Sequence, residues 1–128
     1  MDVVNLEKLA GYLEAGDLQA NFDMSTYCDL GYLYQGTCGS VGCAVGHGPY
    51  AGIPKDPHET WIEYANRVFG LNIIEQEWCF GSYWAKYDPT SLGAARRIRF
   101  LIRHQDIVND PNLSQKELIK ICNETQLY

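Results

Sequence analysis

The sequence has few basic residues and no long apolar run. It contains 10 lysines and arginines against 16 aspartates and glutamates in 128 residues, which gives a formal net charge of −6. Binding to phosphate backbones or anionic lipids requires a basic surface, so we expect neither a nucleic-acid duplex nor a membrane among its partners. No segment is long and apolar enough to span a bilayer, and no signal peptide is visible. We therefore expect a cytoplasmic protein.

The motifs of several common enzyme classes are also missing. There is no glycine-rich phosphate loop, no dinucleotide-binding fingerprint and no His-Glu-x-x-His. Carboxylate pairs such as Glu75 and Glu77 exist, but nothing in the sequence places them together in a cleft. We therefore expect a protein that is not an enzyme and that uses no cofactor.

The composition is that of a folded helical domain. Hydrophobic residues make up 46% of the chain, and 128 residues are enough to bury a core without metal or disulfide help. We predict a single all-α domain over residues 1–128 with five to six helices, and leave open a minor strand pair in residues 17–37. The glycine-rich segment over residues 38–52 is expected to form a short, closely packed helix that ends near Gly48.

Capping residues predict where the helices begin and end. We expect a first helix from an N-cap at Asn5 to Gly16 and a second from Asp56 to Gly70. A short helix follows over residues 75–80. The next helix starts at Thr90 or Ser91, and the last starts at Ser114, with Glu117 completing a capping box. The apolar residues at helical spacing, which we expect to face the core, are Trp61, Tyr64, Ala65, Val68 and Phe69, then Ala94, Ala95, Ile98, Leu101 and Ile102.

The densest group of potential metal ligands is Cys38, Cys43 and His47, with Cys28 or Cys79 as a fourth. In a helix, Cys43 and His47 would lie one turn apart on the same face, where they would bind zinc together. Common zinc sites use two ligand pairs, however, and the second pair is missing here. The alternative is that these cysteines are small buried residues. We predict that no metal is required and keep a zinc-stapled structural domain as an alternative.

Residues 35–40, with the sequence QGTCGS, resemble the segment ahead of the nucleophile in papain-like cysteine proteases. The resemblance implies that Gln35 helps form an oxyanion hole and that Cys43 is the nucleophile. One residue is inserted before Cys43, and the second half of the chain is helical in pattern where the family is rich in β-structure. We therefore predict that Cys43 is buried and unreactive. A cysteine hydrolase that uses Cys43 with His47 or His104 remains an alternative.

Two neighbouring segments suggest a ligand pocket. Arg96, Arg99 and Arg103 fall on one helical stripe, away from the apolar stripe of the same helix, and arginine binds phosphate or carboxylate through two parallel hydrogen bonds. The alternative is a solvated face paired with acidic neighbours. Just upstream lies an aromatic group that exceeds what one helix face buries, although pure packing would also explain much of it: Trp78, Phe80, Tyr83, Trp84 and Tyr87. We predict that the three arginines face a pocket shared with Trp78, Tyr83 and Trp84.

The chain resembles a set of small uncharacterised phage and bacterial proteins. The residues that carry this resemblance are the sequence FDMST at 22–26, the pattern CGSxxCxxGH at 38–47 and an alanine- and arginine-containing helix at 94–102. The resemblance implies a small accessory protein of phages or mobile elements, in the cytoplasm of the host cell. We therefore expect a counter-defence factor that sequesters a small anionic, nucleotide-like signal or blocks a host protein, and we leave a homo-oligomer open.

Overall fold

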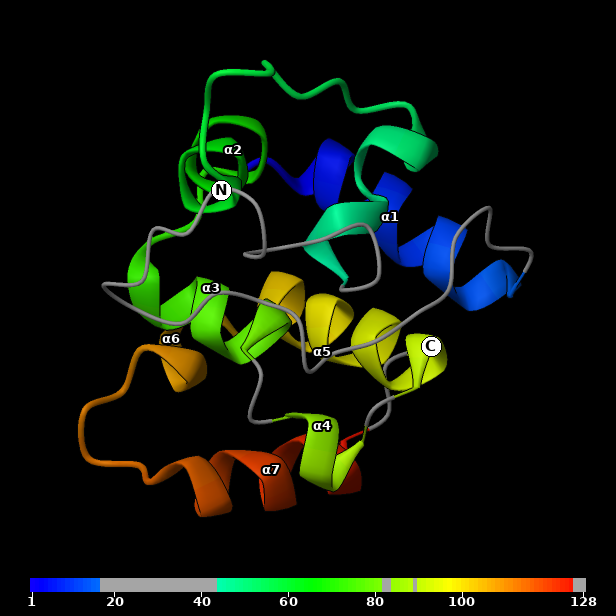
Figure 1. The fold of residues 1–128 in the computed structure, drawn as a ribbon. Coiled ribbons are helices and arrows are strands. Elements are labelled where there is room, and N and C mark those ends of the chain that lie inside the picture. Colours follow the sequence, from blue (N-terminus) through cyan, green and yellow to red (C-terminus); the bar gives the residue numbers. More distant parts are fainter. Residues whose placement is uncertain (17–43, 82–83, 89, 126–128) are drawn as a thin grey trace.

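A computed structural model describes residues 1–16, 44–81, 84–88 and 90–125, and within them the chain is helical (Figure 1). These residues contain no strand, so the all-α prediction is confirmed for this part of the chain; the strand pair considered for residues 17–37 lies outside it. No helix in the described ranges is long and apolar enough to cross a membrane. The elements are α1 (Val3–Ala15), η2 (Val45–His47), η3 (Pro49–Ala51), α2 (Trp61–Phe69), α3 (Ile73–Phe80), α4 (Trp84–Tyr87), α5 (Ser91–Arg103), α6 (Gln105–Val108) and α7 (Gln115–Glu124).

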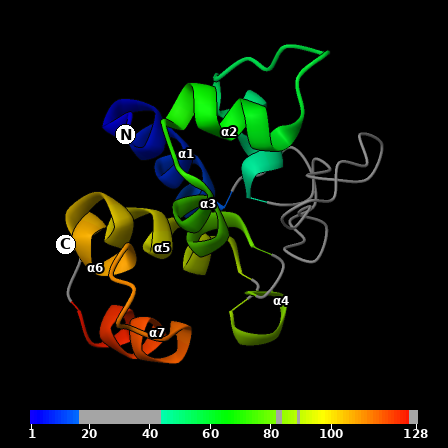
Figure 2. The ribbon, with the colours of Figure 1, turned by 90° about the vertical axis from the view of Figure 1, so that its left-hand side faces the viewer.

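Helix α5 runs through the middle of the molecule. In two perpendicular views α1 and α2 lie on one side of it, and α4 and α7 lie on the other (Figures 1 and 2). It packs along α1 and against α3. The apolar stripe predicted for α5 is buried at four of its five positions, and Ile102 is partly buried. The residues that form the α1–α5 part of the core are Leu6, Leu9, Leu13, Ala94, Ala95, Ile98 and Leu101.

The predicted starts of the first two long helices were wrong. The N-cap of α1 is Asp2, whose carboxylate accepts a hydrogen bond from the backbone of Asn5, while the Asn5 side chain donates to the carbonyl of Val68 at 2.8 Å. The N-cap of α2 is Thr60, which forms a capping box with Glu63. The expected cap Asp56 instead closes a separate turn, because its side chain accepts from the backbone of a residue ahead of α2. In both cases a second capping residue lies within four positions of the predicted one.

Two further predicted starts are confirmed: Thr90 caps α5, and Ser114 and Glu117 form the capping box of α7. The short helix expected over residues 75–80 is α3, which ends at Phe80 as predicted but begins earlier, at Ile73, with Asn72 as its N-cap. Gly16 and Gly70 end α1 and α2 in the left-handed conformation, with φ of 75° and 63°. This conformation strains residues with a side chain, so glycine is the favoured stop.

The glycine-rich segment folds as two short turns, η2 and η3, and not as one helix; residues 38–43 lie outside the described part. Gly48 joins the two turns, and a Cβ atom at this position would lie 2.2 Å from the hydroxyl oxygen of Tyr64. The buried Tyr64 hydroxyl donates to the carbonyl of Ile53 at 2.6 Å. The absence of a side chain at Gly48 therefore leaves room for the Tyr64 ring to pack closely against this segment.

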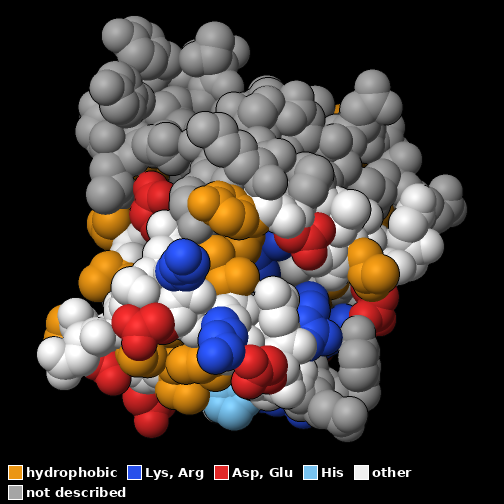
Figure 3. Space-filling model, turned by 90° about the horizontal axis from the view of Figure 1, so that it is seen from below, with side chains coloured by type: hydrophobic (Ala, Val, Ile, Leu, Met, Phe, Trp, Pro, Cys, Tyr) orange, Lys and Arg blue, Asp and Glu red, His pale blue; other side chains and the backbone are white. Residues whose placement is uncertain are grey.

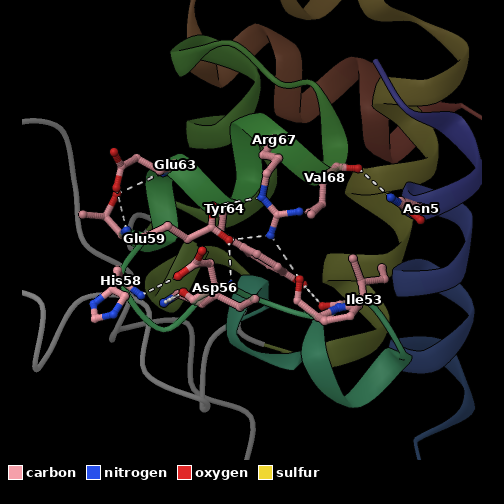
Figure 4. Close-up of polar contacts among 12 residues, drawn as sticks. Asn5, Ile53, Asp56, His58, Glu59, Glu63, Tyr64, Arg67 and Val68 are labelled. Carbon is pink, nitrogen blue, oxygen red and sulfur yellow. Dashed lines mark hydrogen bonds and ion pairs between the residues drawn. The ribbon is translucent and has the colours of Figure 1, made fainter.

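A surface arginine ties this loop to α2 (Figure 4). Arg67 donates from Nε to Glu59 Oε2 at 3.0 Å and from Nη2 to the carbonyl of Pro54 at 3.1 Å. The Arg67 side chain is 52% exposed. The Glu59 carboxylate also accepts from the backbone of Asp56, so one ion pair joins the turn ahead of α2 to the last turn of the helix.

Candidate functional site

The three arginines predicted to share a pocket point to different places. Arg96 donates from Nη2 to the carbonyls of Cys122, at 2.9 Å, and Thr125, at 2.7 Å, and so closes the end of α7. Arg99 forms ion pairs with two carboxylates of α1, those of Glu7 and Glu14. Arg103 is exposed near the end of α5. Within the described residues, Arg96 and Arg99 are therefore paired with different neighbouring helices, Arg96 with α7 and Arg99 with α1.

Most of the aromatic group belongs to the core. Trp78, Phe80 and Trp84 are buried, and the rings of the two tryptophans meet edge to face with centroids 5.1 Å apart. Trp84 donates from Nε1 to the carbonyl of Trp78 at 2.6 Å, which fixes its indole. Tyr87 is 58% exposed, and Tyr83 lies outside the described residues.

Arg97 is the arginine that the sequence reasoning missed. Its side chain is only 3% exposed, and its guanidinium carbon lies 4.2 Å from the centroid of the Trp84 ring. Nη1 donates to the carbonyl of Asp88 at 3.1 Å and lies 4.0 Å from the Asp88 carboxylate. Nε and Nη2 are buried and have no hydrogen-bond partner among the described residues. Arg97 follows Ala94 by three residues and precedes Leu101 by four, so the helical spacing of these two core residues was the signal that could have placed it on the buried face.

The charge on Arg97 is poorly compensated. Burial lowers its pKa to about 10, and the neighbouring Asp88 carboxylate opposes this shift only in part. The side chain is still protonated at neutral pH, so two N–H donors of a charged group are held in the protein without an acceptor. An unsatisfied buried donor typically costs about 1–3 kcal/mol, and more when the group is charged. A feature of this kind is a candidate binding site.

Arg97 lines a small cavity between α4, the first half of α5 and the second half of α7. Its volume is about 230 Å³. Arg96 and Trp84, two residues of the predicted pocket, also line it. Arg99, Arg103 and Trp78 do not. We refer to this cavity as the Arg97 pocket; its described lining residues are Trp84, Tyr87, Asp88, Gly93, Arg96, Arg97, Ile119, Cys122 and Asn123.

Asp88 is held in place over the first turn of α5. Its Oδ1 accepts a hydrogen bond from the Thr90 hydroxyl at 2.7 Å. A Cβ atom at Gly93 would lie 2.2 Å from Asp88 Oδ2, so the carboxylate occupies the space that a side chain at position 93 would need. The described residues that line the pocket thus include two cationic groups, Arg96 and Arg97, and one anionic group, Asp88. Their formal sum is one positive charge, which suits an anion as ligand.

The cysteine in this pocket is not activated. Burial raises the pKa of Cys122, and the opposing effect of Arg96 and Arg97 does not reverse the shift. A thiol in this state is a poor nucleophile at neutral pH. Burial likewise raises the pKa of Cys79, which is fully buried. These two cysteines therefore do not indicate covalent catalysis.

Most residues of the zinc and protease hypotheses lie outside the described part: Cys28, Gln35, Cys38 and Cys43. His47 is buried beside the rings of Tyr12 and Tyr50. His104 follows α5 and packs against Phe100. Within the described ranges, no group of three histidine, cysteine or acidic side chains is placed to hold a metal ion.

A larger and more apolar groove of about 570 Å³ lies between α3 and the segment from α6 to α7. Ile73 and Ile74 at its rim are 41% and 57% exposed, and its charged lining residues in the described part are Glu77 and Asp110. Seen from the side of α4 and α7, the described part of the surface mixes hydrophobic, basic and acidic side chains without a large patch of one charge (Figure 3). Comparisons of the chain with protein family models, curated proteins and solved structures found no match.

Proposed function

We propose that this protein is a non-catalytic binding protein that holds a small anionic ligand in the Arg97 pocket. The observation that carries the proposal is the buried guanidinium of Arg97, with two nitrogens that lack acceptors in the described part of the chain. An anion at these nitrogens would supply the missing hydrogen bonds and neutralise the charge, and charge-assisted bonds of this kind are among the strongest in proteins. Trp84, Tyr87 and Ile119 provide apolar walls beside the charged group.

The pocket limits the size of the ligand. A volume of about 230 Å³ is below the roughly 300–1,000 Å³ typical of pockets that enclose drug-sized molecules. An anionic group with a short body fits inside, whereas a whole nucleotide would lie partly outside. Sequestration of such a signal as phage or mobile-element counter-defence is the wider role that we propose, and its support is the sequence resemblance.

Titration calorimetry with a panel of small anions tests the proposed function. The panel contains acetate, benzoate, inorganic phosphate, phenyl phosphate and adenosine monophosphate, measured on the wild type, Arg97→Lys and Arg103→Gln. We expect at least one anion to bind and Arg97→Lys to weaken it about ten- to a hundred-fold, the equivalent of roughly 1.5–3 kcal/mol for hydrogen bonds to a charged group. Arg103→Gln, on the same helix but outside the pocket, should change little. Absence of binding across the panel would overturn the proposal.

The groove favours protein binding as a second candidate function. Its exposed isoleucines and acidic lining suit a basic, amphipathic helix of a partner protein, such as the host protein considered from the sequence. A synthetic leucine- and lysine-rich helical peptide is the probe. Ile74→Asp should weaken its binding, while Val4→Asp, which alters a 68% exposed residue on α1, should not. Equal binding to both variants would rule out this use of the groove.

A further inference from the structure

The two unpaired nitrogens of Arg97 lie on the same edge of its guanidinium. Nε and Nη2 direct two nearly parallel N–H bonds away from that edge, whereas Nη1, on the other side, is engaged by Asp88. Two parallel donors match two acceptor oxygens on one ligand atom, which is the usual bidentate pairing of arginine with a carboxylate or phosphate. The pattern of paired and unpaired atoms thus leaves one complete donor edge available.

The charge around this edge selects between the two kinds of anion. The described lining residues sum to one positive charge, with the Cys122 thiol neutral, and one negative charge balances it. A phosphate monoester carries about −1.5 to −2 at pH 7. Its additional oxygens also need donors, but Asp88 offers only acceptors, and Arg96 already uses Nη2 on the carbonyls of α7.

Building on the proposed function, we propose that the ligand is a small monocarboxylate that binds side-on to the Nε–Nη2 edge of Arg97. Its short apolar body lies against Tyr87 and Ile119, while the fixed indole of Trp84 covers the face of the guanidinium. Both nitrogens lie below the pocket surface. The carboxylate reaches them through a small displacement of the Tyr87 ring at the end of α4, which is 58% exposed, while Trp84 keeps its place.

Benzoate and phenyl phosphate are the probes, because they share a ring and differ in the anionic group. The readouts are calorimetric affinity at pH 7.5 and the Nε–Hε resonance of Arg97 in a nitrogen-15 correlation spectrum. We expect benzoate to bind at least ten-fold more tightly than phenyl phosphate and to shift the Arg97 resonance, but not that of Arg103. Arg97→Lys keeps the charge but removes the donor edge, so it should lose this preference while circular dichroism shows an intact fold.

Asp88→Asn provides a second variant that keeps an acceptor for Thr90 and raises the formal charge of the lining from one to two. In this variant, the ratio of the affinity for benzoate to the affinity for phenyl phosphate should fall at least three-fold. Phenyl phosphate binding more tightly than benzoate to the wild type, with a shift at Arg97, would overturn the monocarboxylate proposal and leave the proposed function standing. Binding of neither probe, with an unmoved Arg97 resonance, would overturn the monocarboxylate proposal; if the wider anion panel also fails, the proposed function is overturned as well.

Discussion

Arg67 and Arg97 differ in burial and in the hydrogen bonding of the same two guanidinium nitrogens. Arg67 is half exposed, yet its Nε and Nη2 both have protein acceptors (Figure 4). Arg97 is almost completely buried, and the same two atoms have no acceptor within the ranges that the structure describes. Water would satisfy the donors of Arg67 without any protein partner, whereas those of Arg97 depend on the protein or on a ligand. Nε and Nη2 therefore have acceptors in Arg67, where hydrogen bonding matters little for stability, and lack them in Arg97, where it matters most. This difference identifies the Arg97 pocket as the candidate site.

The pKa shifts of the two arginines differ in the same way. The hydrogen bond that Arg67 donates to Glu59 raises the pKa of Arg67, while burial lowers the pKa of Arg97. Glu75 shows that burial alone does not decide the direction of a pKa shift. Burial would raise the pKa of this buried carboxyl group, but hydrogen bonds from the Asn72 backbone and the Asn109 and Gln105 side chains together lower it. The buried charge is thus compensated at Glu75 and only partly compensated at Arg97.

Among the variants considered, replacement of Arg97 by methionine has the largest range of expected change in the free energy of unfolding. Methionine fills similar space without a charge, and Asp88 is 43% exposed, so water can solvate its carboxylate once the arginine is gone. We expect the free energy of unfolding, measured by urea denaturation, to stay equal or rise by up to about 4 kcal/mol. A clear loss of stability would mean that the guanidinium is well compensated in the ligand-free protein, contrary to our interpretation.

The second prediction concerns Glu75, a buried charged group that, unlike Arg97, has hydrogen-bond partners for its charge. Glu75→Gln should destabilise the protein at pH 7 by about 1.5–3 kcal/mol, because it removes hydrogen bonds to a charged group. Since the folded-state pKa of Glu75 lies below its ordinary value of 4.5, its contribution is complete above that pH and is lost as the pH falls through the folded pKa. Urea denaturation between pH 7 and pH 3 should therefore show wild type and variant converging in acid. Curves that stay parallel would exclude this role.

The third prediction compares two N-cap residues, Thr60 of α2 and Thr90 of α5. Thr60→Ala and Thr90→Ala each remove an N-cap, and each should cost about 1 kcal/mol of stability. Only Thr90 also donates to Asp88, so only Thr90→Ala should change the relative affinities of benzoate and phenyl phosphate. Calorimetry on both variants at equal helicity measures this difference. An equal change in both would show that the effect is not local to the Arg97 pocket.

The smallest effect is expected at Arg67. Because its ion pair with Glu59 is exposed, Arg67→Met should lower stability only slightly at low ionic strength. Salt screens exposed charges, so the difference from the wild type should vanish in 1 M sodium chloride. Thermal unfolding at both salt concentrations measures it. A difference that persists at high salt would mean that packing of the arginine stem, and not its charge, supports the turn ahead of α2.

The sequence predicted several features that depend on neighbouring residues, although it missed the local capping box at Thr60 and Glu63. The stop at Gly70 and the capping box at Ser114 and Glu117 are local, and both are confirmed. The choice of Asp2 over Asn5 as a cap was not predictable, because Asn5 is drawn to a carbonyl of α2 that lies 63 positions away in the chain.

The pairing of the arginines depends on the same kind of long-range contact. Arg99 meets acidic residues on α1, and Arg97 lies under a tryptophan of α4. The spacing of the three arginines predicted that they share a face of α5. It could not predict which residues of the surrounding helices they would contact.

The close fit between Gly93 and Asp88 has an evolutionary consequence. The missing Cβ at position 93 leaves the space in which the carboxylate at position 88 lies. A larger residue at 93 is accommodated most simply by a smaller residue at 88, so we expect the two positions to covary among homologous sequences. A homologue with such a pair would lack the negative charge beside its counterpart of Arg97. Its pocket would then be more cationic, and a divergent lineage could acquire a new ligand through two coupled substitutions.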